Sequence, residues 1–123
     1  MGTEIVVVED DEGVRDLVAY RLRTDGFDVT TYEDGRAAWE ALVSRASPPD
    51  AVVTDVMLPG IDGLTLLRRI RGHDGLASVP VILLTSRGLE SDVTEAFASG
   101  ATDYLTKPFR PNELLARVRR VVG

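Results

Sequence analysis

The apolar residues of this chain fall into short runs that alternate with longer amphipathic stretches. The run from Ile5 to Val8 is apolar throughout and too short for a helix, which is typical of a strand covered on both faces. From Glu12 to Thr24 apolar residues recur at helical spacing, which predicts an amphipathic helix that Asp25 and Gly26 end with a turn. The same alternation predicts further strands at Phe27–Tyr32, Ala51–Thr54, Val81–Leu84 and Thr102–Leu105, and further helices at Gly35–Ser44, Gly63–Arg71, Glu90–Ala98 and beyond Pro111.

This order of elements predicts an α/β fold. Five strands that alternate with five helices through short connections are typical of a single doubly wound parallel sheet with helices on both faces, here with the flavodoxin-like strand order 2-1-3-4-5. The chain has 123 residues and no low-complexity linker. We therefore expect one domain over residues 1–123 and no output domain.

Charge and composition exclude several kinds of protein. The 20 acidic and 14 basic residues give a net charge of −6, which argues against direct nucleic-acid binding. The absence of cysteine excludes disulfides, thiolate metal ligands and cysteine nucleophiles. No apolar stretch approaches the roughly 18 residues that a membrane span needs, and the first residues lack the basic run of a secretion signal. We expect a cytoplasmic protein without membrane contact.

Polar side chains gather where the predicted strands end. In such a sheet ligands bind outside the carboxyl ends of the strands, and the first and third strands are neighbours there. Asp10 and Asp11 follow the first strand and Asp55 follows the third, so their carboxylates should converge and repel one another unless a cation lies between them. Oxygen ligands with room for water favour Mg²⁺. The open alternative is that Asp10 or Asp11 only caps the first helix.

The other strand ends carry a hydroxyl and a cation. Thr85 follows the fourth strand and could donate a hydrogen bond to an oxyanion, and Lys107 follows the fifth strand and could reach the carboxylates. An ordinary strand-end threonine and a surface lysine are the alternatives. Together, a metal, a cation and a hydroxyl around one carboxylate are the groups that phosphoryl transfer uses, with Asp55 as the nucleophile.

Four motifs follow one another along the chain. They are the acidic pair in Val8-Glu9-Asp10-Asp11, the segment from Asp55 through Met57, Pro59 and Gly60 to Gly63, the triplet Leu84-Thr85-Ser86, and the segment from Gly100 through Tyr104 and Lys107-Pro108 to Phe109. Taken in order, these motifs resemble those of the CheY-like receiver domains of bacterial two-component response regulators. The resemblance covers the whole chain.

The resemblance implies a role for each site residue. Asp55 would accept a phosphoryl group from a phosphohistidine, with Mg²⁺ held by Asp11, Asp55 and the Met57 main-chain carbonyl, and by Asp10 through water. Thr85 and Lys107 would bind phosphoryl oxygens, a cis peptide between Lys107 and Pro108 would aim the lysine, and the small Ser86 would leave the pocket accessible. In this family, two positions that flank the site control the phosphoryl lifetime, and Met57 and Arg87 occupy these positions here. Neither residue orients water well, so self-dephosphorylation should be slow.

The resemblance also implies a switch and its partners. Phosphorylation would draw Thr85 inward and make room for Tyr104, which changes the surface of the fourth helix, fifth strand and fifth helix. The partners would be a sensor histidine kinase or a histidine phosphotransfer protein, and a downstream effector or output domain. A homodimer through the same surface is compatible with this picture. The chain would catalyse only its own phosphorylation and dephosphorylation, and would not otherwise be an enzyme.

Three alternatives remain open to test. An aspartyl phosphatase of the haloacid-dehalogenase family typically carries a second aspartate two residues after the nucleophile, where this chain has Met57. A flavodoxin-like nucleotide binder needs a phosphate loop after the first strand, where the acidic residues of this chain would repel phosphate. A receiver that acts only as a docking surface would not need the complete set of site residues.

Overall fold

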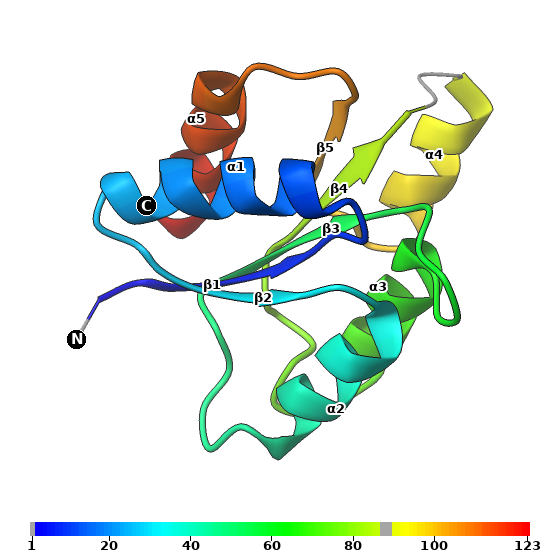
Figure 1. Cartoon of the computed structure of the whole chain (residues 1–123). Coiled ribbons are helices and arrows are strands. Elements are labelled where there is room, and N and C mark those ends of the chain that lie inside the picture. The colour runs from blue at the N-terminus through cyan, green and yellow to red at the C-terminus, as the bar shows by residue number, and fades with distance from the viewer. Residues whose placement is uncertain (1, 87–89) are drawn as a thin grey trace.

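The computed structural model describes residues 2–86 and 90–123, with the side chains of all of these except 90–92. Within these residues strands and helices alternate strictly (Figure 1). The strands are β1 (Glu4–Val8), β2 (Asp28–Tyr32), β3 (Ala51–Asp55), β4 (Val81–Thr85) and β5 (Asp103–Thr106). The helices are α1 (Glu12–Thr24), α2 (Gly35–Ser44), α3 (Gly63–Arg71), α4 (Glu90–Ala98) and α5 (Pro111–Val122).

The strands form one parallel sheet with the order β2-β1-β3-β4-β5, which confirms the predicted fold class. Helices α1 and α5 cover one face, and α2, α3 and α4 cover the other (Figure 1). Side chains alternate along each strand, so the core consists of two clusters. On β1, Ile5 and Val7 belong to the cluster under α1 and α5, and Val6 and Val8 belong to the cluster under the other three helices.

Two candidate site residues end strands rather than follow them. β3 includes Asp55 and β4 includes Thr85, each one residue beyond the strand that the sequence predicts. Main-chain hydrogen bonds continue past these ends: the Val56 N–H donates to the Leu84 oxygen at 2.8 Å, and the Lys107 N–H donates to the Thr85 oxygen at 2.7 Å. The carboxyl edge of the sheet is therefore held by the sheet's own hydrogen bonds.

Three of the helices begin with an aspartate whose side chain accepts a hydrogen bond from a main-chain N–H of the first turn. Such a cap satisfies one of the N–H groups that a helix start leaves without a partner. The three pairs are Asp11 with Val14 at 2.9 Å, Asp34 with Ala37 at 2.7 Å and Asp62 with Thr65 at 2.8 Å.

Helix α3 begins against the end of β3 without room for a side chain. The Gly63 N–H donates to the Val56 oxygen at 2.9 Å. A Cβ atom on Gly63 would lie 2.2 Å from the main-chain oxygen of Asp55, an overlap that only glycine avoids. The turn after Asp55 is thus closed against the helix.

We expect Gly63→Ala to lower the free energy of unfolding by about 2 kcal/mol or more, because the main chain must move to admit the methyl group. Gly72→Ala, at the other end of α3, is the matched control. Gly72 has φ −90°, and an added Cβ would lie 3.4 Å from its nearest neighbour. That variant should change the free energy of unfolding by less than about 1 kcal/mol. Urea unfolding measures both, and equal stabilities would contradict the close approach at Gly63.

Candidate functional site

Strand pairing brings acidic residues of the first and third strands together. Val8 lies opposite Thr54 in the parallel register, so the next residues, Glu9 and Asp55, lie side by side at the carboxyl edge. Each stands two residues after a valine of the cluster under α1 and α5. Because side chains alternate along a strand, both carboxylates point to the same side of the sheet.

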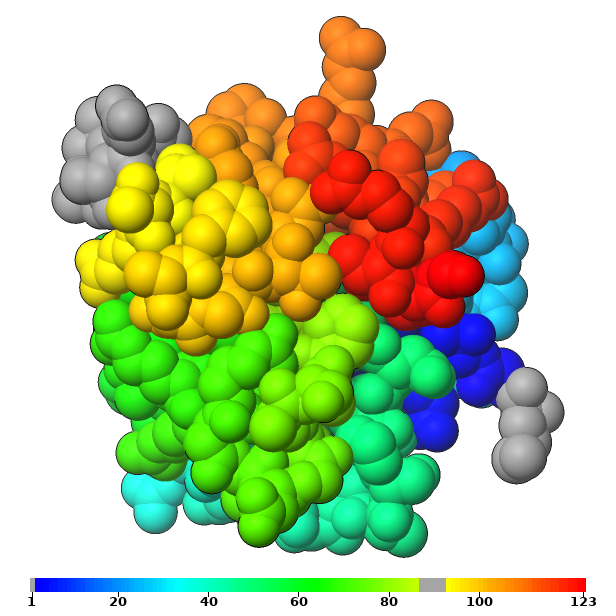
Figure 2. Space-filling view, turned by 180° about the vertical axis from the view of Figure 1, so that it is seen from behind, coloured from blue at the N-terminus to red at the C-terminus, as the bar shows by residue number. Residues whose placement is uncertain are grey.

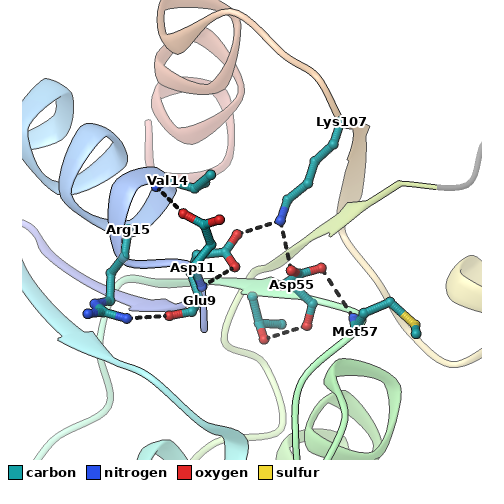
Figure 3. A network of polar contacts seen from close by, with 8 residues as sticks. Glu9, Asp11, Val14, Arg15, Asp55, Met57 and Lys107 are labelled. Atoms are coloured by element: carbon teal, nitrogen blue, oxygen red, sulfur yellow. Dashed lines mark hydrogen bonds and ion pairs between the residues drawn. The ribbon is translucent and has the colours of Figure 1, made fainter.

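Lys107 reaches these two carboxylates from the end of β5. Its Nζ lies 2.7 Å from Asp55 Oδ2 and 2.6 Å from Glu9 Oε1 (Figure 3). The Glu9 side chain is fully buried and that of Asp55 is 7% exposed. Water therefore screens these ion pairs little, and loss of the lysine would leave two buried carboxylates without a cation.

The protonation of this cluster follows from its burial. Burial raises the pKa of Glu9 to about 7, and the negative charge of Asp55 adds to the rise, while the hydrogen bonds from Lys107 and the Asp11 N–H oppose it. Burial alone would lower the pKa of Lys107, but its bonds to Asp55 and Glu9 outweigh that effect and raise it. Lys107 is therefore a cation at neutral pH.

The carboxylates that converge are those of Glu9, Asp10 and Asp55, whereas the sequence pattern predicts Asp10, Asp11 and Asp55. One carboxylate oxygen from each of the three converging residues lies within 4.8 Å of the other two. Asp11 instead turns toward α1 and caps it. The alternative that one of the two aspartates serves as a helix cap thus applies to Asp11.

The cluster fits a divalent cation. Three carboxylates with oxygen atoms within 4.8 Å of one another repel, and two of these three are buried. They offer only oxygen donors, which are the ligands that Mg²⁺ prefers, and the exposed Asp10 leaves one side open to water.

Glu9 is the site residue that the sequence reasoning missed, although a signal for it exists. Glu9 stands two residues after Val7 in the strand pattern, and Asp55 stands in the same relation to Val53. Asp11 directly precedes a predicted helix, where aspartate is a preferred capping residue. Strand alternation and helix capping, applied together, would have selected Glu9 over Asp11.

Of the remaining predicted site residues, Met57 contacts Asp55 directly. The Met57 N–H donates to Asp55 Oδ1 at 3.2 Å, and the Met57 side chain is exposed. The peptide bond between Lys107 and Pro108 is cis, as expected. Ser86 is exposed beside the end of β4. Arg87, predicted to affect phosphoryl lifetime, lies outside the described residues.

Thr85 and Tyr104 line one pocket of about 190 Å³ between the sheet and α4. Most of its lining is apolar, and Met57 contributes to it as well. The Tyr104 ring packs edge-on against Phe97 of α4, with the ring centroids 5.8 Å apart. The structure thus places both predicted switch residues at the same cavity.

In the part of the chain that the structure describes, no helix combines the length and apolar character needed to cross a bilayer.

The sequence matches the family described as the response regulator receiver domain over residues 5–119. The chain belongs to this family. Receiver domains are the signalling switches of two-component response regulators, so the predicted functional class is confirmed. The transcriptional regulatory protein CseB of Streptomyces avermitilis is 44% identical to this receiver domain over 120 residues, which cover 98% of this chain and 49% of that protein. The chain spans about half the length of the curated relatives it matches.

Two solved structures share both fold and sequence with this receiver domain. One is the receiver domain of the sensor histidine kinase PA1611 from Pseudomonas aeruginosa, with a magnesium ion coordinated in its active-site cleft. It is 34% identical, with a TM-score of 0.89, and the match covers 100% of this chain and 99% of that one. The other is the BeF3-activated receiver domain of Klebsiella pneumoniae RstA, which is 39% identical, with a TM-score of 0.86 and 97% of each chain covered.

Asp10 and Asp11 should respond to substitution in opposite ways. We expect Asp10→Ala to lose most of its Mg²⁺ affinity with little change in stability, because its exposed carboxylate belongs to the cluster. Asp11→Ala should keep Mg²⁺ binding and lower the free energy of unfolding by about 1 kcal/mol, the usual cost of a lost N-cap. Calorimetric Mg²⁺ titration and urea unfolding measure the two effects.

Asp62→Ala is the control for this comparison, because it removes the same kind of cap and the same charge from the start of α3. It should lose a similar amount of stability and bind Mg²⁺ as the wild type does. Loss of Mg²⁺ binding in Asp11→Ala but not in Asp10→Ala would show that the cluster is assigned wrongly.

Proposed function

We propose that Asp55 is the phosphoacceptor of this receiver domain and that its phosphorylation switches the surface formed by α4, β5 and α5. The environment of Asp55 carries the proposal: a buried carboxylate paired with Lys107 and flanked by two further carboxylates. The donor would be the phosphohistidine of a sensor histidine kinase or of a histidine phosphotransfer protein.

In the proposed reaction, a carboxylate oxygen of Asp55 attacks the phosphorus of the phosphohistidine. The new O–P bond forms as the P–N bond breaks, and the imidazole leaves with the electron pair of that bond and takes up a proton. The Met57 N–H and Lys107 orient the Asp55 carboxylate from its two oxygens. Lys107 and the Thr85 hydroxyl would then bind the phosphoryl oxygens, where negative charge develops.

Glu9, Asp10 and Asp55 would hold Mg²⁺, with the Met57 main-chain carbonyl as a further oxygen ligand. The ion, when bound, would neutralise phosphoryl oxygens during transfer. The all-oxygen donor set supports this assignment, as does the magnesium ion in the cleft of the similar PA1611 receiver domain. Asp11 is left out of the proposed set because its carboxylate caps α1.

The pocket shared by Thr85 and Tyr104 supports a switch of the predicted kind. A phosphoryl group that drew Thr85 toward Asp55 would free space in this pocket for the Tyr104 ring. Movement of the ring away from Phe97 would change how α4 packs on β5. Figure 2 shows α4 in yellow, β5 in orange and α5 in red as one continuous surface. This surface would contact an effector, an output domain or a second receiver domain.

The same proposal sets the limits of the chemistry. The receiver domain would catalyse only its own phosphorylation and dephosphorylation, in the cytoplasm, and would act on proteins rather than bind nucleic acid or membrane.

Met57 is 63% exposed next to Asp55, and its thioether cannot orient an attacking water. We therefore infer slow loss of the phosphoryl group. The small, exposed Ser86 leaves the site open to the donor.

Incubation with acetyl phosphate and Mg²⁺, followed by rapid acid quenching and intact-mass measurement, tests the proposal. We expect the mass to rise by about 80 Da, the mass of one phosphoryl group. The adduct should be lost in Asp55→Asn, because the nucleophile is missing. It should also be lost when EDTA removes the metal, because the cation is missing.

Asp62→Asn is the matched control, since it changes the same functional group outside the carboxylate cluster and should be phosphorylated normally. A folded wild-type protein that gains no mass would contradict the proposal and favour a receiver that acts only as a docking surface. An adduct that persists in Asp55→Asn would place the phosphoacceptor elsewhere.

A further inference from the structure

We propose that Arg15 is a positioning residue for the carboxylate cluster, because its guanidinium orients the peptide group from which Asp10 extends. Arg15 lies in the first turn of α1, outside the cluster itself. The inference rests on the proposed function in one respect, the choice of Mg²⁺ as the ion that the cluster binds.

The turn from β1 to α1 is held by hydrogen bonds on each side of Asp10. The Glu9 N–H donates to the Tyr32 oxygen at 3.0 Å, and the Asp11 N–H donates to Glu9 Oε2 at 3.1 Å. Between them, the main-chain carbonyl of Glu9 accepts from Arg15 Nη1 at 2.9 Å (Figure 3). This carbonyl shares one rigid peptide plane with the Asp10 nitrogen. Arg15 therefore fixes the direction in which Asp10 leaves the turn.

Asp10 depends on this restraint more than the other two members of the cluster do. Glu9 and Asp55 are buried, and Lys107 holds both of their carboxylates. Asp10 is exposed, and among the described residues no hydrogen bond or ion pair restrains its carboxylate. Its main chain is the part of Asp10 that the fold holds in place, and Arg15 bonds to the peptide group that leads into it.

The positioning role of Arg15 and its positive charge predict opposite effects of its loss on Mg²⁺ affinity. A guanidinium beside a cation site repels the incoming ion, so removal of the charge alone would tighten Mg²⁺ binding. Removal of a positioning group would instead leave Asp10 free to rotate away from the other carboxylates. Groups that orient metal ligands typically change metal affinity 10- to 100-fold, and we expect about tenfold weaker binding, because Arg15 holds main chain rather than a ligand atom.

Arg23 provides a matched control on the same helix. Its Nη2 donates to the main-chain carbonyl of Val29 on β2 at 2.8 Å, at the other end of α1. Arg23→Ala therefore removes the same charge and the same kind of arginine-to-carbonyl hydrogen bond without touching the turn that holds Asp10.

Calorimetric titration with Mg²⁺ alone, on the wild type, Arg15→Ala, Arg15→Lys and Arg23→Ala, tests the proposal. We expect the dissociation constant of Arg15→Ala to rise about tenfold and that of Arg23→Ala to stay at the wild-type value. Arg15→Lys should recover part of the affinity, since its ammonium can donate to the same carbonyl. At saturating Mg²⁺, Arg15→Ala should reach the wild-type extent of phosphorylation, because the excess ion offsets the weaker binding and Asp55, Met57 and Lys107 keep their mutual contacts.

Urea unfolding in EDTA separates this effect from a loss of fold, and Arg15→Gln replaces Arg15→Ala should the alanine variant fail to fold. Unchanged or tighter Mg²⁺ binding in the neutral variant would overturn the role of Arg15 and leave the proposed function standing. Equal weakening in Arg23→Ala would also overturn it, by showing a general effect of charge on α1. A wild-type chain that neither binds Mg²⁺ nor accepts a phosphoryl group would overturn the proposed function, and the assignment of Arg15 with it.

Discussion

The ion pairs of Lys107 with Glu9 and Asp55 are the interaction on which the site depends. Two carboxylates that come from neighbouring strands and are buried side by side would be costly without a cation, and the lysine from β5 supplies one. With Asp10 added, the cluster carries more negative charge than one lysine balances. The excess negative charge that makes Lys107 necessary also makes the site suited to a second cation. The two cations together could neutralise the oxygens of a group bound beside them.

The sheet supplies the geometry of this cluster, and the connecting turns refine it. The parallel register places Glu9 beside Asp55. The hydrogen bonds between β4 and β5 fix the position of the Lys107 main chain. Gly63 lets α3 close the turn after Asp55, and the Asp11 cap closes the turn before α1. On the other side of the sheet, by contrast, the pocket at Thr85 and Tyr104 leaves room for movement. A carboxylate cluster held by the sheet thus adjoins a pocket in which a side chain has room to move.

Most of the fold and much of the site follow from local patterns in the sequence. Strand runs and helix spacing predict all the elements that the structure describes, and the polar residues at strand ends predict that Asp55 and Lys107 meet. The sequence pattern predicts that Asp10, Asp11 and Asp55 converge, one residue later along the chain than the observed Glu9, Asp10 and Asp55. Closeness along the chain takes no account of side-chain alternation in β1, which puts Glu9 on the side of Asp55. The bond from Arg15 to the Glu9 carbonyl was out of reach of pattern reasoning. It depends on how a long side chain folds back over its own turn, which no periodicity encodes.

The structure of this receiver domain with Mg²⁺ and beryllofluoride, which mimics a phosphoryl group on a carboxylate, tests the assigned cluster most directly. We expect beryllium bonded to an Asp55 oxygen, Lys107 against a fluoride, and the ion between Glu9, Asp10 and Asp55, with Asp11 still capping α1. An ion ligated by Asp11 in place of Glu9, or beryllofluoride bound away from Asp55, would contradict the assignment of the site.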